Sequence, residues 1–421
     1  MSATPAVKLQ PVRGMRDLFG AEQRRHAAVR ETARQVTLSY GFAEIETPVL
    51  EFIEVFLRTL GDSSDVVTKE IYAFRDQGEV DLCLRPENTA SVMRALVSNG
   101  LTQALPQRLF YAGPMFRRER PQKGRYRQFS QVGVELIGAP EPLADVEVIA
   151  CGQDFLSRLG LDGQLRLEIN TLGDSASRSA YRAALVEYFS QHRAALSPES
   201  QTRLTQNPLR ILDSKQEADR ALVAEAPRFD AYLNPASEAF FAQVCSGLDA
   251  LGIAYQHNPY LVRGLDYYNH TAFEFISDNL GAQGTVLAGG RYDGLLETMG
   301  GPPIAGIGWA SGVDRLALLD SVATPATPKP LVVMPLDAEA EAEALRVARA
   351  LRQAGQTVLL SSQGKLAKRL KLANRLDASH AIMIGSEELA RGDDSVKALA
   401  SGTQSQQRLD LLKKGVWHGA A

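Results

Sequence analysis

Residues 113–136 read GPMFRRERPQKGRYRQFSQVGVEL and gather positive charge in one short loop. Within the first fifteen of these residues, a single acid, Glu119, opposes six cations. The cations are Arg117, Arg118, Arg120, Lys123, Arg125 and Arg127. Arginine binds phosphate through a planar, bidentate fork, so a cluster of arginines is typical of phosphate recognition. A solvated basic turn is the alternative, but its cations would repel one another without a counter-anion.

The two flanks of this loop, 108–117 and 126–138, are strand-like and predict a long hairpin. Because side chains alternate between the faces of a strand, the second flank has an apolar face and a polar face. The apolar face holds Val132, Val134 and Leu136, and the polar face holds Phe129, Gln131, Gly133 and Glu135. A solvated sheet edge could carry such a polar face. Beside the basic loop, it favours a polar ligand lying across the strand, with Gly133 leaving room.

Residues 82–90 (LCLRPENTA) end a strand and open a helix, with Asn88 or Thr89 available as the N-cap. Glu87 at this junction is equally an ammonium-binding carboxylate or an acid of the first helical turn.

Two further segments combine polar residues with glycine. Residues 261–270 (LVRGLDYYNH) place Arg263, an aspartate and two tyrosines around a glycine, a mixture that ordinary strands rarely carry. Residues 288–294 (AGGRYDG) predict a glycine-lined turn that holds Arg291 and Tyr292.

Residues 306–312 (GIGWASG) imitate a dinucleotide-binding fingerprint, and a helix is expected at 313–319. A true fingerprint closes the first strand of a βαβ unit, with an acid about 20 residues further on. This stretch instead lies at the end of its domain, which argues against a nicotinamide or flavin cofactor. We expect its glycines to let a helix pack on the sheet and to bring Arg315 to the site.

The elements that must position these residues are of mixed type. Helices are expected at 21–39, 87–98 and 144–159, and strands at 108–117, 127–137, 165–170, 271–276 and 305–310. This order predicts an α+β domain built on an antiparallel sheet, covering residues 1–325. Residues 174–250 contain alanine-rich segments and predict a helical insertion in that domain.

A proline-rich linker, 321–330, precedes a smaller region. Strands expected at 331–335, 357–360 and 381–385 alternate with helices at 338–354 and 364–376, which predicts an α/β domain over 331–421. In the second of these helices, Leu366, Leu370 and Ala373 are expected to be buried. Its exposed face is expected to carry Lys365, Lys368, Arg369, Lys371 and Arg375, either as a solvated surface or for nucleic-acid contact.

The composition excludes several classes of protein. The 421 residues carry a net charge of −3, yet residues 331–421 hold 13 Lys and Arg against 10 Asp and Glu. No apolar run is long enough to span a membrane, and no secretory signal is evident at the N-terminus. Three cysteines without CxxC spacing and six scattered histidines predict neither a disulfide framework nor a metal site. We therefore expect a reduced, cytoplasmic protein.

Taken together, these segments resemble the class II aminoacyl-tRNA synthetases, and specifically the histidyl-tRNA synthetase family, over nearly the whole chain. The resemblance begins at residues 12–17 (VRGMRD); residues 46–48 (ETP) are similar to motif 1, 113–135 to motif 2 and 306–315 to motif 3. Residues 263–268 and 288–294 are similar to the two histidine-specific segments and are the most specific signals. Asn88 and Ser130 depart from the glycine and histidine that are common at their positions.

The resemblance implies activation of L-histidine with ATP and Mg²⁺ and its transfer to tRNA(His), by a homodimer whose interface includes the motif 1 proline. For ATP it implies Arg117 at the α-phosphate, Arg125 in the nucleotide site, Glu119 at the adenine amino group, and Phe129 and Arg315 against the adenine faces. For histidine it implies Glu87, Thr89 and Gln131 at the α-ammonium, Glu135 and Tyr268 at the ring nitrogens, and Tyr267 and Tyr292 closing the pocket. Arg263 would contact the α-phosphate and the substrate carboxylate, where other class II enzymes use a second metal ion. Arg120 and Gln122 are candidates for contact with the tRNA.

Two rival interpretations remain. The nearest is a non-catalytic paralogue that acts as a regulatory subunit of ATP phosphoribosyltransferase. Such proteins usually lack the C-terminal domain and part of the segment at 263–268, and this chain has both. A pure RNA-binding module would not require Glu87, Glu135 and Arg263 around one pocket.

Overall fold

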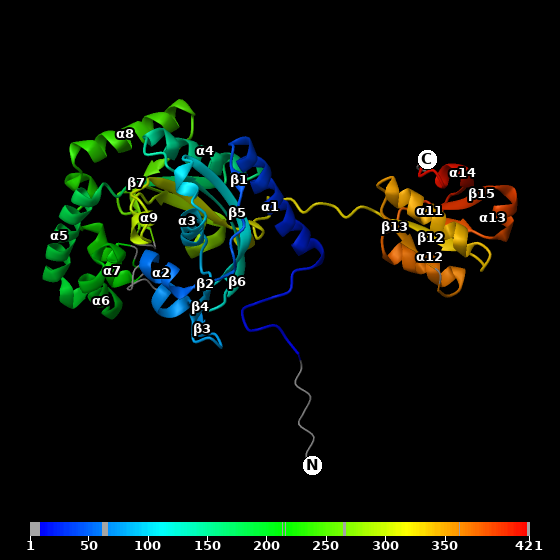
Figure 1. Ribbon diagram of the computed structural model, residues 1–421, viewed down its shortest axis with the longest axis horizontal. Coiled ribbons are helices and arrows are strands. Elements are labelled where there is room, and N and C mark those ends of the chain that lie inside the picture. The colour runs from blue at the N-terminus through cyan, green and yellow to red at the C-terminus, as the bar shows by residue number, and fades with distance from the viewer. Residues whose placement is uncertain are drawn as a thin grey trace, which may run out of the picture. The chain divides into compact units, whose positions relative to one another are not determined.

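The basic loop and its flanks form an antiparallel hairpin, in which β5 (Gln107–Phe116) pairs with β6 (Gln128–Ile137) over their full lengths. In this computed structural model the described residues are 9–60, 66–212, 214, 216–263, 267–361 and 363–418. Gly264, Leu265 and Asp266, part of a segment singled out in the sequence, lie outside them. The chain divides into two compact units, Met1–Pro325 and Ala326–Ala421 (Figure 1).

The hairpin belongs to an eight-stranded sheet with the order β1-β5-β6-β11-β10-β9-β7-β8. The remaining strands are β1 (Ala43–Glu44), β7 (Leu165–Thr171), β8 (Gln256–His257), β9 (Asn269–Ser277), β10 (Thr285–Arg291) and β11 (Gly306–Gly312). Only the edge pairs β1–β5 and β7–β8 are parallel. The predicted α+β domain with an antiparallel sheet is therefore confirmed.

The two faces of this sheet differ in what covers them. On one face, α1 (Gly20–Ser39), α4 (Pro142–Arg158) and α8 (Pro235–Ala250) contribute to one hydrophobic core with Val132, Val134 and Leu136, as the alternation predicted. On the other face, α3 (Thr89–Ser98) and α9 (Leu295–Thr298) pack at one end and leave the middle of the sheet open to a cavity. The polar side chains of the hairpin share this second face.

The predicted turn at residues 288–294 is wrong, because most of this segment is the central strand β10, paired with both β9 and β11. Its glycines admit large neighbours and do not reverse the chain. A Cβ at Gly289 would lie 2.6 Å from the Phe273 ring, and a Cβ at Gly290 would lie 2.8 Å from the Tyr268 ring. Glycine in a strand interior marks such close approaches as well as turns.

A small second sheet has the order β2-β4-β3 and lies beside α2 (Ile53–Leu60) and η1 (Val66–Glu70). Its strands are β2 (Leu50–Phe52), β3 (Tyr72–Arg75) and β4 (Asp81–Leu84). Leu82 pairs with Phe52 on one side and with Phe74 on the other, so the three side chains form a cross-strand row. Phe52 is 60% exposed and Phe74 46% exposed, and this face of the sheet is therefore apolar and open in the single chain.

The predicted helical insertion, 174–250, contains two packing groups. The helices α5 (Ser175–Gln191), α6 (Pro198–Gln206) and α7 (Glu217–Ala224) share a core of their own, seen together in Figure 1. The last helix, α8, packs instead against α4 in the main core. At the base of the insertion, Asp174 caps α5, Asn234 caps α8, and the Asn234 amide donates to the Asp174 carboxylate at 2.7 Å.

Short helical segments complete the first unit. They are η2 (Leu101–Gln103), η3 (Arg193–Ala195), η4 (Pro208–Ile211), η5 (Phe229–Tyr232), η6 (Asp278–Gln283) and α10 (Val313–Leu316). The last of these is shorter than the helix expected at 313–319. Within the described residues, the helices fall short of the length and hydropathy that crossing a bilayer requires.

The second unit is a five-stranded sheet with the order β13-β12-β14-β15-β16. Its strands are β12 (Leu331–Pro335), β13 (Val358–Leu360), β14 (His380–Ile384), β15 (Asp393–Ala398) and β16 (Gln404–Arg408). Its helices are α11 (Glu341–Gln353), α12 (Leu366–Arg375), α13 (Ser386–Arg391) and α14 (Leu409–Leu412). The α/β prediction is confirmed for the parallel strands, while β15 and β16, which add an antiparallel edge, were not foreseen.

The burial of α12 differs from the prediction at two positions. Leu366, expected in the core, is 37% exposed, and Arg369, expected at the surface, is 5% exposed. Arg369 donates from Nη1 to the carbonyl oxygens of Pro335 (2.7 Å) and Ser361 (2.8 Å). It thereby satisfies carbonyl groups at the ends of neighbouring elements, which a sequence pattern of charge cannot reveal. The exposed basic residues of α12 are Lys365, Lys368, Lys371 and Arg375.

Candidate active site

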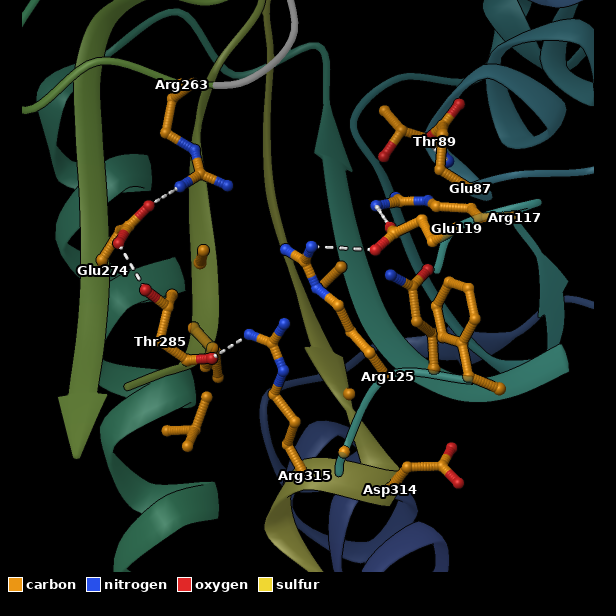
Figure 2. Close-up of a pocket in the computed structure, with 18 of the residues that line it drawn as sticks. Glu87, Thr89, Arg117, Glu119, Arg125, Arg263, Glu274, Thr285, Asp314 and Arg315 are labelled. Atoms are coloured by element: carbon orange, nitrogen blue, oxygen red, sulfur yellow. Dashed lines mark hydrogen bonds and ion pairs between the residues drawn. The ribbon is translucent and has the colours of Figure 1, made fainter. Parts of the chain in front are cut away.

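The open face of the large sheet forms the floor of a cavity of about 290 Å³. Most of the residues singled out in the sequence line it: Glu87, Thr89, Arg117, Glu119, Arg125, Phe129, Gln131, Arg263, Tyr267, Tyr268 and Arg315. They come from four separate stretches of the chain, and the fold alone brings them together (Figure 2).

Four arginines make the cavity strongly cationic. Arg117 follows β5, Arg125 lies in the loop, Arg263 precedes β9, and Arg315 lies on α10. Arg117 is fixed by a hydrogen bond from Nε to the Pro86 carbonyl at 2.9 Å, and its guanidinium lies 5.4 Å from the centre of the Phe129 ring. Arg315 donates from Nη1 to the Thr285 carbonyl at 2.7 Å. Burial, and then the charge of Arg125, lower the pKa of Arg315, as expected for cations forced together.

Two acids act as counter-anions for these arginines. Glu119 lies 2.9 Å from Nη1 of Arg125 and 3.9 Å from Nη1 of Arg117. Arg263 is paired with Glu274 on β9, whose other oxygen accepts from the Thr285 hydroxyl at 2.7 Å (Figure 2). Burial disfavours the charge on Arg263, but Glu274 outweighs it, and the pKa of Arg263 is raised.

A buried carboxylate lines the same cavity, beside Arg117 (Figure 2). Glu87 occupies the end of α3, where its carboxylate accepts from the backbone N–H of Thr89 (2.7 Å) and Ala90 (2.9 Å). The Glu87 carboxylate therefore makes the N-terminal capping hydrogen bonds of α3 that were expected from Asn88 or Thr89. It also lines the cavity. Burial raises the pKa of Glu87, although the two backbone donors act in the opposite direction. A buried carboxylate of this kind is suited to receive a cation.

Two predicted residues lie just behind the cavity wall. Glu135 is 1% exposed and accepts from the Thr89 hydroxyl at 2.7 Å and from the Tyr292 hydroxyl. Burial raises the pKa of Glu135 to about 8, even though the hydrogen bonds from Tyr292 and Thr89 lower it. Neither Glu135 nor Tyr292 lines the cavity itself, so Thr89 is the link between the cavity and this buried pair.

The remaining predicted residues, Arg120 and Gln122, are exposed on the loop and do not line the cavity. The tip of that loop is closed by reciprocal backbone hydrogen bonds between Gln122 and Arg125.

The glycines of β11 have a role that differs from the expected one. A Cβ at Gly308 would collide with the Glu135 carboxylate, and a Cβ at Gly306 would collide with the Tyr292 ring. They therefore make room for the buried Glu135–Tyr292 pair and do not serve helix packing. Arg315 does reach the cavity from the helix that follows, as expected.

Sequence reasoning missed several residues of the site. Glu274 lies on β9 and Thr285 on the neighbouring strand β10, and only the hydrogen bond between them and the contact of Glu274 with Arg263 reveal them. Asp314, next to Arg315, accepts from the Ser130 N–H and from Arg16, both at 2.8 Å, and so ties β6 to the start of the chain. Tyr111 on β5 was also missed, because it lies in an apolar stretch of the sequence. For Asp314, the only signal in the sequence was its position next to Arg315.

Arg291, noted with Tyr292 in the sequence, lies outside the cavity. Its guanidinium is fully buried, pairs with Asp145 of α4, and also contacts Asp293 at 3.0 Å. It therefore connects the sheet to α4 and has no access to a ligand. Within the described ranges, the structure contains no group of three or more His, Cys, Asp or Glu side chains arranged to hold a metal.

Comparison with known proteins places this geometry in a family. A histidyl-tRNA synthetase family model matches residues 14–316, and an anticodon binding domain model matches residues 331–416. The chain is 57% identical over 404 residues to the histidine–tRNA ligase of Gluconacetobacter diazotrophicus, covering 96% of this chain and 97% of that one. It is also 57% identical over 406 residues to that of Rhodospirillum rubrum, covering 96% and 98%.

Solved structures give the same picture. An apo histidyl-tRNA synthetase from S. aureus superimposes with a TM-score of 0.80 at 34% identity, covering 97% of this chain and 99% of that one. An ATP phosphoribosyltransferase regulatory subunit/histidyl-tRNA synthetase from Bacillus halodurans shares the fold, with a TM-score of 0.66 at 24% identity over 91% of this chain and 100% of that one. The matches over both units and the identity to full-length relatives lead to one conclusion. The chain belongs to the histidyl-tRNA synthetase family.

Proposed function

We propose that this chain is a histidine–tRNA ligase, which activates L-histidine with ATP to histidyl-adenylate and then transfers histidine to the 3′ end of tRNA(His). The observation that carries the proposal is one cavity that combines several cations with buried carboxylates. Four guanidinium groups line it together with the buried Glu87, and Thr89 in its wall donates to Glu135. Such a cavity suits a polyphosphate and a cationic amino acid side by side.

In the first step the histidine carboxylate attacks the α-phosphorus of ATP, and negative charge builds up on the phosphoryl oxygens. We assign Arg117 and Arg263 to that charge, because preorganised cations stabilise a transition state without reorganising. A general base is not required, since the attacking carboxylate is already ionised. Phe129 and Arg315 would hold the adenine between them, and Arg125 would contact the nucleotide. Glu119 would break its ion pair with Arg125 and accept a hydrogen bond from the adenine amino group.

We assign the part of the cavity around Glu87 and Thr89 to the amino acid. Glu87, Thr89 and Gln131 would receive the α-ammonium, and Glu135 and Tyr268 would bind the ring nitrogens. Tyr267 and Tyr292 would close the pocket. Tyr292 would act through Glu135, to which its hydroxyl donates a hydrogen bond. A site whose polar groups are paired only by the correct substrate can reject an analogue without the ring nitrogens by about 10⁴-fold.

Magnesium would enter with ATP. Mg²⁺ usually binds through one or two carboxylates together with substrate phosphate oxygens and water. Glu274 and Thr285 supply such hard oxygen atoms at the cationic end of the cavity. The bound cation would offset the charge of the departing pyrophosphate.

For the tRNA, we assign Arg120 and Gln122 on the exposed loop to the acceptor end, next to the cavity entrance. The second unit would bind the anticodon, and the exposed cations of α12 are candidates for its backbone contacts. Charging of tRNA would also place the protein in the cytoplasm.

We further propose a homodimer, in which the open face of the small sheet meets a second copy. Support comes from the exposed side chains of Phe52 and Phe74, which flank Leu82 in one cross-strand row, and from the motif 1 segment directly before β2. Large apolar side chains that are exposed together on a monomer usually mark an interface. Sedimentation of Phe52→Glu should show monomers where the parent chain shows dimers, whereas dimers of both would contradict this interface.

Attachment of labelled histidine to tRNA by the purified protein tests the proposed function. The regulatory-paralogue alternative predicts no attachment, and its support is weaker, because this chain retains the second unit and Arg263. Charging that requires histidine, ATP and Mg²⁺ together is the expected result. A protein that binds histidine but leaves tRNA uncharged would favour the alternative.

A further inference from the structure

Tyr111 presents an unpaired hydroxyl to the cavity. The side chain lies on β5, is 2% exposed, and contributes to the cavity wall at the end that holds Glu87 and Thr89. Its hydroxyl is buried and has no hydrogen-bond partner among the described residues. Buried hydroxyl groups in native proteins are nearly always paired, so an unpaired one facing a ligand cavity indicates a partner that the ligand supplies.

The opposite strand is adapted to this hydroxyl. Tyr111 pairs directly with Gly133 on β6, and a Cβ at Gly133 would lie 2.5 Å from Tyr111 Cζ, with the hydroxyl closer still. The same Cβ would lie 2.6 Å from the Trp309 carbonyl oxygen. Glycine in a strand interior is unfavourable, so this position gives up intrinsic strand stability to leave the phenol in place.

The register of the hairpin puts the phenol in a polar row. Gln131 and Glu135 flank Gly133 on the same face of β6, two residues to either side. Oε1 of Gln131 is likewise buried without a partner among the described residues. Burial, and then the charges of Glu135 and Glu87, raise the pKa of Tyr111 well above its usual value. The phenol therefore stays neutral and keeps a proton to donate.

We propose that Tyr111 is a further substrate-contacting residue, whose hydroxyl hydrogen-bonds a ring nitrogen of the amino acid and so helps to select imidazole. This inference rests on the proposed function and gives the lone pair of the ring to Tyr111 in place of Tyr268, with the N–H left to Glu135. Glu135 lies behind the wall, and the Tyr268 ring centre lies 5.5 Å from the Arg263 guanidinium. The polar neighbour of the Tyr111 hydroxyl is Thr89, whose own proton goes to Glu135, so Tyr111 keeps its proton for a ligand. A neutral imidazole offers one N–H and one lone pair, and the phenol suits the lone pair.

The test compares equilibrium binding of two ligands to the full-length chain by calorimetry. The ligands are L-histidine and 3-(2-thienyl)-L-alanine, which keeps a five-membered aromatic ring but has no ring nitrogen. Tyr111→Phe removes only the hydroxyl and is expected to weaken histidine binding about tenfold while leaving thienylalanine binding within twofold. Gly133→Ala, which displaces the phenol without removing it, is expected to weaken histidine binding in the same selective way.

Tyr40→Phe is the matched control, because the Tyr40 hydroxyl bonds Asp154 far along the chain and outside the cavity. It should bind both ligands as the parent chain does. Equal weakening of both ligands by Tyr111→Phe, or an unchanged histidine affinity, would overturn the inference. So would a selective loss in Tyr268→Phe with none in Tyr111→Phe. Failure of the parent chain to bind histidine would instead sink the proposed function, before any variant is compared.

Discussion

Thr89 Oγ1 donates a hydrogen bond of 2.7 Å to Glu135 Oε1, and this contact joins the wall of the cavity to the carboxylate behind it. The same residue supplies a backbone N–H to Glu87, so two buried acids meet at the first turn of α3. A cation that enters the cavity beside Glu87 and Thr89 acts on both acids. The protonation of Glu135 should therefore be coupled to histidine binding.

This coupling predicts a pH dependence. The pKa of Glu135 is about 8 in the empty site, raised by burial, so below pH 8 the carboxyl is mainly protonated. If histidine binds the ionised form, its affinity rises with pH and levels off above 8. Between pH 6.5 and 8 we expect the KM for histidine to fall about tenfold, with the KM for ATP nearly constant.

Thr89→Val provides the check on that assignment. The hydrogen bond from Thr89 lowers the pKa of Glu135, so its loss should move the midpoint of the pH profile upward. A profile whose midpoint is the same in both proteins would mean that another group titrates.

Arg263 should contribute mainly to the transition state. Arg263→Ala is expected to lower kcat by about 10²- to 10³-fold, while the KM for histidine changes less. Glu274→Gln keeps the shape but removes the ion pair, and we expect a smaller loss in kcat, because Arg263 would be less well oriented. Steady-state pyrophosphate exchange measures both. A loss confined to KM would contradict the role given to Arg263.

Gly308 should be intolerant of a side chain. Gly308→Ala places a methyl group against the Glu135 carboxylate and the Val134 carbonyl, so either the strand or the carboxylate must move. We expect a loss of about 1–3 kcal/mol in the free energy of unfolding, with a raised KM for histidine. Gly294→Ala is the matched control, because it has open space around its Cβ and an ordinary φ. Gly300→Ala is unsuitable, because its positive φ would strain any side chain. Equal denaturation midpoints for Gly308→Ala and the parent chain would refute the steric argument.

Removal of the second unit should separate adenylate formation from the transfer of histidine to tRNA. A chain that ends at residue 325, the boundary of the first compact unit, retains every residue of the cavity. We expect nearly normal adenylate formation and a fall of about 100-fold in kcat/KM for tRNA, because one of two linked binding surfaces is lost. Equal charging by the long and short chains would remove the anticodon role from residues 331–421.

Sequence patterns predicted the hairpin and its two faces, because period-two alternation in 126–138 has a local cause. They failed at residues 288–294, where glycine was taken for a turn. The true reason for those glycines, the rings of Phe273 and Tyr268, comes from neighbouring strands that local reasoning cannot see. The prediction that Arg369 is exposed failed for a similar reason, because the carbonyl groups that it binds belong to other elements.

The sequence predicted those residues of the site that are charged and clustered along the chain. The arginines and Glu87 stand out in the sequence, and the fold brings them to one cavity. Glu274, Thr285 and Tyr111 do not stand out, because each sits singly in an ordinary strand and gains its meaning from a contact across the sheet. The position of Glu135 behind the wall could not be foreseen either, since the alternation gives a face but no depth.

The most direct test of the central claim is ATP–pyrophosphate exchange by the purified full-length protein, measured with Mg²⁺ and each of the twenty amino acids in turn. The account predicts exchange with histidine alone, because only its ring can pair the polar groups assigned to the two ring nitrogens. Exchange with a different amino acid, or with none, would contradict it.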